Sequence, residues 1–394
     1  MEEKIILHIQ SYQQPPDTRH VDVLDGVRAL CVLLVGWFHI WQQGWLAPSF
    51  YWGKTWVSLD FLLRTGYLWV DGLLLLSGFL LYLPYAQAGQ KLPGALSFYK
   101  RRLIRILPSY LLCVVPMFIL ACVRGEYASA LAAAEDLAAH LTFTFNWFRS
   151  TYFSTPINGA LWTLAVEMQI YLLFPLLARC YKKAPALTYL GMTAAAFAFR
   201  YYASQQEETG MYFNQLPAFL DVYANGFLAA SVFTALHKRL GSEIDGKIKI
   251  FFTAMAVICV CGILQIAQAQ ARESSVQLGQ MARRFPFSAL LACFMLCAAF
   301  SVAPMRFLLG NKIMYFLSLV SFQFYIYHQM LAVKLKEWRV VPSLSATPWS
   351  SGEYQWQVKY ILLCFVLALV LATLITFLFE RPLARMLRRK TLHE

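Results

Sequence analysis

The stretch VRALCVLLVGWFHIWQQGW, residues 27–45, decides the fold class of this chain. It is apolar over about the 20 residues that a helix needs to cross a bilayer. Only two ionisable side chains, Arg28 and His39, interrupt it. Their spacing of eleven residues is close to three helical turns, so both lie on one helix face, roughly 16 Å apart along the axis. Ionisable groups are costly at membrane depth and usually mark functional paths there.

The composition of the whole chain agrees with a membrane protein. The 394 residues are 59% hydrophobic and only 14% charged, whereas soluble domains carry about 25% charged residues. Apolar runs of spanning length recur along the chain, which predicts an all-α integral membrane protein with a bundle of about ten transmembrane helices. The predicted spans are 27–46, 66–86, 106–123, 159–178, 185–203, 216–236, 248–267, 285–303, 313–333 and 358–379.

The net charge of +13 would suggest nucleic acid in a soluble protein, but here the basic residues punctuate the spans, and no nucleic-acid partner is expected. Lys and Arg concentrate after every second span, and cytoplasmic loops carry such an excess. Both termini are therefore predicted to be cytoplasmic, with His39 toward the outer side. The main basic clusters are KRRLIR (100–105), RCYKK (179–183), HKR (237–239) and RPLARMLRRK (381–390).

The sequence shows no soluble domain, signal peptide or metal site. The first 26 residues are polar and contain two consecutive prolines, so the first apolar run reads as a retained helix. The nine cysteines mostly lie inside apolar runs, without the spacing of a disulfide framework or zinc site. The expected organisation is a cytoplasmic segment over 1–23, a membrane domain over 24–385 and a basic cytoplasmic tail over 386–394.

Two sets of charged residues flank the cytoplasmic ends of predicted spans. Asp25 lies three residues before Arg28 and suits either an ion pair with it or the capping of the helix start. Arg102 and Arg105 share one helix face at the start of their span. Guanidinium groups bind phosphates in a bidentate manner, although such a cluster is equally typical of topology anchoring.

Glu167 lies in the middle of NGALWTLAVEMQIYLLFPLL (158–177), between Trp162 and Tyr171. A carboxylate in an apolar run is costly unless it is paired or protonated, so Glu167 is either functional or part of an ion pair between helices. Ser77 precedes Gly78 in another span, where a small residue allows a helix or a ligand to approach closely.

A second membrane histidine, His328, occurs in SLVSFQFYIYHQML (318–331), one turn after Tyr325. Histidine is the side chain best suited to proton transfer near neutral pH. A structural hydrogen bond from His328 to a neighbouring helix is an equally good interpretation.

These motifs, in this order, resemble the acyltransferase-3 family of membrane acyltransferases, which includes bacterial O-acetyltransferases that act on O-antigen, peptidoglycan and other glycans. The resemblance extends from Leu24 to Arg385. One departure is Thr163, where the family usually has serine. The matching elements are LDGVRAL with Arg28 and His39, the Arg-x-x-Arg pair Arg102 and Arg105, Trp162 with Leu164, Glu167 and Tyr171, the YIYH element with Tyr325, Tyr327 and His328, and the Glu-Arg-Pro at 380–382.

The resemblance implies a multi-pass protein of the bacterial cell membrane, in the stand-alone form that lacks an appended hydrolase-like domain. It implies an acyl-CoA donor, usually acetyl-CoA, taken from the cytoplasm, and no permanently bound cofactor. The implied acceptor is a hydroxyl of an extracytoplasmic glycan or lipid-linked sugar, and the oligomeric state is left open. The alternative class is a secondary transporter or flippase, which also buries Arg, His and Glu, although no inverted repeat is visible.

Acyl transfer needs an activated nucleophile and a site that holds the donor. His39 is expected to act as general base on the acceptor hydroxyl, or to carry the acyl group itself, and Glu167 to orient it. Arg28, Arg102 and Arg105 are expected to bind the donor. The residues left for an acceptor or structural site are Asp25, Ser77, Trp162, Tyr171, Tyr325 and His328.

Overall fold

The computed structural model describes residues 21–87, 94–241 and 244–391. Residues 1–20 of the expected N-terminal segment and the last three residues of the expected tail lie outside this part. The described chain is helical except for one two-stranded hairpin, which confirms the all-α fold class. Within the described ranges, nine helical segments are long and apolar enough to cross a membrane.

Ten long helices cover the ten predicted spans. The predicted span 185–203 coincides with helix α9, which is not among the nine segments, because Arg200 and the two tyrosines after it make it less apolar. The long helices are α2 (Val23–Gly44), α4 (Trp69–Ala86), α5 (Ala95–Val123), α8 (Trp162–Lys183), α9 (Pro185–Ser204), α11 (Leu220–Leu240), α12 (Gly246–Ala271), α13 (Val276–Ala299), α15 (Lys312–Glu337) and α16 (Tyr354–Ile375).

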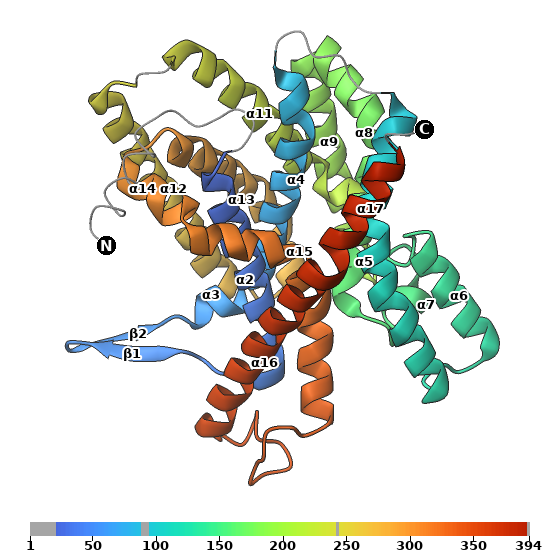
Figure 1. Cartoon of the computed structure of the whole chain (residues 1–394). Helices are drawn as coiled ribbons and strands as arrows, with labels where there is room; N and C mark the ends of the chain where they lie inside the picture. Colours follow the sequence, from blue (N-terminus) through green and yellow to red (C-terminus); the bar gives the residue numbers. More distant parts are fainter. Residues whose placement is uncertain (1–20, 88–93, 242–243, 392–394) are drawn as a thin grey trace.

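Short elements connect these helices. The antiparallel hairpin β1–β2 projects away from the bundle, and α6 and α7 lie beside α5 (Figure 1). The π-helical turn η4 joins α16 to α17, so the last three elements form one long rod in Figure 1. The short elements are β1 (Ser49–Trp52), β2 (Thr55–Ser58), α3 (Asp60–Arg64), η1 (Gly66–Leu68), α6 (Ala130–Leu141), α7 (Arg149–Tyr152), η2 (Gly159–Leu161), α10 (Thr209–Phe213), η3 (Leu216–Phe219), α14 (Ala303–Gly310), η4 (Thr376–Glu380) and α17 (Arg381–Thr391).

Polar side chains define where the two central helices begin. The carboxylate of Asp22 accepts a hydrogen bond from the backbone nitrogen of Val23 at the start of α2. Asn311 caps α15 through bonds of 2.9 and 3.1 Å from the backbone nitrogens of Ile313 and Met314. Each cap satisfies amide groups that have no partner inside the helix, and so sets the register in which α2 and α15 present their histidines.

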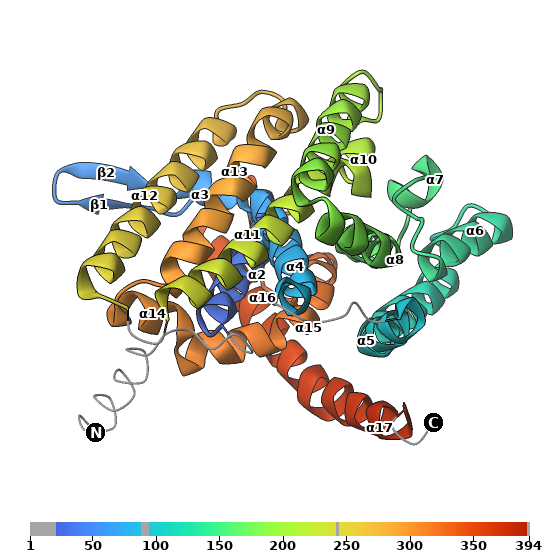
Figure 2. The ribbon, with the colours of Figure 1, turned by 90° about the horizontal axis from the view of Figure 1, so that it is seen from above.

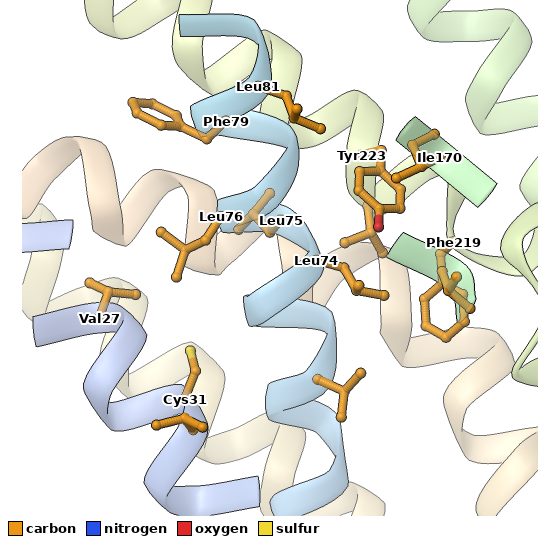
Figure 3. Close-up of a cluster of buried hydrophobic side chains, with 14 of the residues drawn as sticks. Val27, Cys31, Leu74, Leu75, Leu76, Phe79, Leu81, Ile170, Phe219 and Tyr223 are labelled. Atoms are coloured by element: carbon orange, nitrogen blue, oxygen red, sulfur yellow. The ribbon is translucent and has the colours of Figure 1, made fainter. Parts of the chain in front are cut away.

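The core of the bundle surrounds α4, which packs against both α2 and α11. The three helices lie together near the centre of the view from above (Figure 2). A Cβ atom at Gly226 of α11 would lie 2.7 Å from the carbonyl oxygen of Leu75, and one at Gly78 would lie 3.1 Å from that of Tyr223. The two backbones therefore cross in direct contact, as small residues permit in membrane helices. Apolar side chains of α4, including Leu74 and Phe79, fill the space around this crossing (Figure 3).

Two buried ion pairs connect helices of the bundle, and the first of them ties α9 to α11. Arg200 of α9 holds Asp221 of α11 with nitrogen–oxygen distances of 2.9 and 2.7 Å. Arg284 of α13 lies 3.3 Å from Asp71 of α4, and both arginines also donate to the carbonyl oxygen of Ala218. Since a charge at membrane depth needs a partner, the pair with Asp221 explains how α9 carries an arginine into the protein interior.

Candidate functional site

A cavity of about 310 Å³ lies between α2, α4, α5, α8 and α15. It collects most of the residues singled out in the sequence, although they come from five helices. His39, His328 and Trp162 are not among the residues that line it. The predicted residues in its wall are Asp25, Arg28, Ser77, Arg102, Arg105, Glu167, Tyr171 and Tyr325.

Three guanidinium groups line this cavity. Arg28 comes from α2, and Arg102 and Arg105 lie one turn apart on α5. The guanidinium of Arg102 lies over the ring of Tyr171, 5.2 Å from its centroid, and 5.4 Å from that of Phe98. Among the residues that the structure describes, neither Arg102 nor Arg105 forms an ion pair with a carboxylate, so both can bind an anionic ligand.

Glu167 is held in the cavity wall by two hydroxyl groups. Its Oε1 atom accepts hydrogen bonds from Ser77 of α4 at 3.0 Å and from Tyr171, one turn further along α8, at 2.8 Å. These contacts tie α4 to α8 and place Ser77 and Tyr171 in the same network as Glu167.

Asp25 lines the cavity and does not cap its helix. The cap of α2 is Asp22, three residues earlier. Asp25 instead accepts a hydrogen bond of 2.8 Å from Ser318 of α15. It therefore helps to hold the first half of α15 against α2.

The two membrane histidines meet outside the cavity wall. Nδ1 of His39 lies 2.8 Å from Nε2 of His328, and Nδ1 of His328 lies 3.0 Å from the carbonyl oxygen of Phe324. A carbonyl oxygen only accepts, so Nδ1 of His328 carries the hydrogen, and Nε2 of the neutral ring is an acceptor. His39 must then donate from Nδ1, which leaves the lone pair on its Nε2. The hydrogen-bond network thus assigns the tautomers of both rings.

The sequence led us to expect that Glu167 orients His39. In the structure the hydrogen-bond partner of His39 is His328, and Glu167 bonds to Ser77 and Tyr171 instead. The printed sequence already contained both histidines in apolar runs, but nothing in the local pattern indicates that they face each other. The pair is almost fully enclosed, with exposed fractions of 8% for His39 and 0% for His328.

Tyr325 connects the cavity to the histidine pair. It lines the cavity, and its ring centroid is 5.6 Å from that of His328. Its hydroxyl accepts a hydrogen bond of 2.7 Å from Thr163 and donates to the carbonyl oxygen of Ala160 at 3.2 Å. Trp162 has a different environment, since its ring stacks on Phe219 at a centroid distance of 5.8 Å. Trp162 is thus placed to support the start of α8.

Glu380 is a cavity residue to which the sequence interpretation gave no chemical role. It belongs to the π-helical turn η4 and lines the cavity that also contains the three arginines. Gln323 bridges it to α5 by donating from Nε2 to Oε2 of Glu380 and to Oγ of Ser109, both at 2.7 Å. The signal in the sequence was the Glu-Arg-Pro element that Glu380 opens, and the structure adds the π-helical turn, a feature that is frequent at functional sites.

Comparison with known proteins gives the family. The model of a family described as an acyltransferase domain matches residues 21–381. Proteins named O-acetyltransferase OatA from Staphylococcus aureus strains NCTC 8325 / PS 47, COL and MRSA252 are each 32% identical to this chain over 171 residues. The match covers 40% of this chain but only 24% of each relative.

No solved structure matches the chain. The family match covers almost all of the described residues, including the five-helix cavity and the histidine pair. The chain is a multi-pass membrane protein that belongs to the acyltransferase-3 family.

Proposed function

We propose that this protein transfers an acetyl group from acetyl-CoA to a hydroxyl of a glycan or a lipid-linked sugar. The observation that carries the proposal is the histidine pair, which leaves a lone pair on Nε2 of His39. Tyr325 connects this pair to the cavity with Arg102 and Arg105, two arginines without a carboxylate partner among the described residues. The family match and the name O-acetyltransferase of the relatives support this reaction class.

The donor site would be the five-helix cavity. Arg102 and Arg105 would bind the phosphates of CoA, because guanidinium groups form paired hydrogen bonds with phosphate oxygens. Arg28 would lie further along the donor. The leucines of α4 that line the cavity, such as Leu73 and Leu80, suit the less polar arm that carries the thioester.

In the chemical step, Nε2 of His39 takes the proton of the acceptor hydroxyl as its oxygen attacks the thioester carbonyl. The carbon–sulfur bond then breaks, and the protonated His39 returns the proton to the leaving sulfur of CoA. His328 keeps Nδ1 of His39 in the donating state and supports the positive ring when it forms. In the other route, the same Nε2 atom attacks the thioester first, the carbon–sulfur bond breaks and CoA leaves as the thiolate. The acceptor hydroxyl then attacks the acetyl group on His39, the bond to Nε2 breaks, and the hydroxyl proton goes to the CoA sulfur.

We place the protein in the bacterial cytoplasmic membrane, with residues 24–385 as the membrane domain and both termini, including the tail at 386–394, in the cytoplasm. The distribution of Lys and Arg supports this orientation. It puts the clusters KRRLIR (100–105) and RPLARMLRRK (381–390) on the side from which acetyl-CoA would enter.

The test is acetyl transfer by the purified full chain with radiolabelled acetyl-CoA and a mixture of cell-envelope glycans. We expect His39→Ala to abolish transfer, while His237→Ala, in the last turn of α11 and not among the residues that line the cavity, keeps it. Wild-type transfer by the His39 variant would overturn the mechanism. Accumulation of a solute in vesicles without consumption of acetyl-CoA would instead support a transporter.

A further inference from the structure

A second cavity, of about 300 Å³, lies on the other side of the histidine pair along α15. The five-helix cavity contacts α15 as far as Tyr325, and the second cavity begins at Gln329. These two residues are four positions apart, about 6 Å along the helix axis, and His328 lies between them. The same order holds around the start of α8. Asn158 and Gly159, which precede α8, line the second cavity, and Thr163, in the first turn of α8, lines the five-helix cavity.

We propose that this second cavity is the acceptor subsite and that it binds an uncharged sugar, an inference that rests on the proposed acetyl transfer. The histidine pair then separates a donor cavity from an acceptor cavity, so both substrates approach the reacting atoms from opposite sides. Its volume is at the lower end of the range of about 300–1,000 Å³ that ligand pockets occupy.

The side-chain amide of Gln329 is the polar group that we expect to bind the sugar. Its Oε1 atom is buried and has no hydrogen-bond partner within the part of the chain that the structure describes. Gly159 lies against this amide, since a Cβ atom there would be 3.8 Å from Oε1, an ordinary van der Waals distance. A buried acceptor without a donor is unfavourable, and a sugar hydroxyl is a donor that would satisfy it.

Thr155, in the wall of this cavity, is held by the buried carboxylate of Asp136, which is not itself a lining residue. Oδ2 of Asp136 accepts hydrogen bonds of 2.8 Å from Tyr127 and 2.9 Å from Thr155. The hydroxyl of Thr155 in turn accepts from the backbone nitrogen of Ile157 at 3.2 Å. This network fixes the turn that leads into Asn158, so the second cavity has a preformed polar wall beside the apolar Ile157.

The charges at this cavity neutralise one another. Lys334 lies 2.9 Å from Glu337, and Arg124 lies 3.8 Å from Glu337 and 3.5 Å from Glu126. Lys334, Glu126 and Glu337 line the cavity, and Arg124 pairs with both carboxylates without being a lining residue, so the rim carries no excess positive charge. An anionic sugar or a pyrophosphate would find no counter-charge there, whereas a neutral saccharide needs none.

The experiment measures saccharide binding and acetyl transfer separately, with the purified full chain. Calorimetry without acetyl-CoA uses chitotriose and maltotriose as neutral probes and trigalacturonate as the anionic probe. We expect Gln329→Leu to weaken binding of the neutral probe and raise its KM about tenfold, as loss of a buried hydrogen bond does, at unchanged KM for acetyl-CoA. The matched control is Gln268→Leu on the exposed side of α12.

A charge variant tests the preference for an uncharged sugar. Glu337→Gln leaves the rim with excess positive charge, so it should shift the preference from chitotriose toward trigalacturonate. Equal binding by the wild-type protein and Gln329→Leu, or no binding of either neutral probe by the wild-type protein, would overturn the acceptor subsite. Binding that depends on Gln329 without any acetyl transfer would keep the subsite and overturn the proposed function.

Discussion

The hydrogen bond between His39 and His328 yields the sharpest prediction. In His328→Phe, the new ring keeps the stacking that His328 makes on Phe324, with centroids 5.5 Å apart and planes within 6°, but it has no Nε2 atom. His39 then loses the acceptor that keeps the hydrogen on Nδ1. Either tautomer becomes accessible, and the imidazolium that forms during transfer is left without its supporting contact.

The size of the effect follows from that one bond. Hydrogen bonds to charged groups contribute about 1.5–3 kcal/mol, and each 1.4 kcal/mol is a factor of ten in rate, so kcat should fall about 10- to 150-fold. The enclosed environment, with His328 fully buried, favours the upper part of this range. KM for acetyl-CoA should not change, because His328 does not line the donor cavity.

The assay is initial-rate acetyl transfer by detergent-purified protein, with thermal unfolding of each variant to confirm that it is folded. His328→Gln is the matched control, since its side-chain oxygen can accept the hydrogen bond from Nδ1 of His39, and it should keep most of kcat. In the background His39→Ala, His328→Phe should have no additional effect. If His328→Phe transfers acetyl groups at the wild-type rate while folded, the assignment of the tautomers has no role in catalysis.

Three further predictions concern the donor cavity and the bundle. Arg102→Ala and Arg105→Ala should each raise KM for acetyl-CoA about tenfold or more, because charge-assisted hydrogen bonds are lost. If steady-state titration gives the wild-type KM for both variants, the two arginines serve only to set the orientation of the helix in the membrane. Arg200→Ala should destabilise the protein by about 3–5 kcal/mol because it leaves Asp221 as an unpaired buried charge. Replacement of both residues, as Arg200→Met with Asp221→Leu, should recover most of the melting temperature. An Arg200→Ala variant that melts at the wild-type temperature would refute the stabilising role of the buried pair. Gly226→Leu should prevent the crossing of α4 and α11, seen as loss of the monodisperse peak in size-exclusion chromatography, whereas Gly226→Ala should be milder.

The sequence predicted the spans and much of the cavity because both depend on local patterns. An apolar run of sufficient length becomes a helix in lipid whatever its neighbours are. A polar residue inside such a run must face protein or a water-filled space, so Arg28, Glu167 and Tyr325 were bound to face the interior.

The pairings between helices could not be predicted in the same way. Whether Glu167 faces His39 or Ser77 depends on the rotation and tilt of α8 against α4, which packing of many side chains decides. The contact between His39 and His328 joins residues 289 positions apart, and no periodicity reports on it. The pairing of Arg200 could not be predicted either, because its partner Asp221 lies on another helix. The sequence shows only that the span with Arg200 is less apolar than the others.

The partner of His39 also explains how a base can be kept ready inside a membrane. A carboxylate beside His39 would place a permanent charge in the bundle, which is costly without a second ion. The chain from Nδ1 of His39 through His328 to the carbonyl oxygen of Phe324 is neutral and still directs the lone pair of His39 outward from the pair. In the proposed mechanism, a positive charge would form on His39 only when the acceptor proton arrives, at the moment when negative charge develops on the thioester oxygen. The two charges would stabilise each other in the transition state, so the site would bind it more tightly than it binds the unreacted substrates.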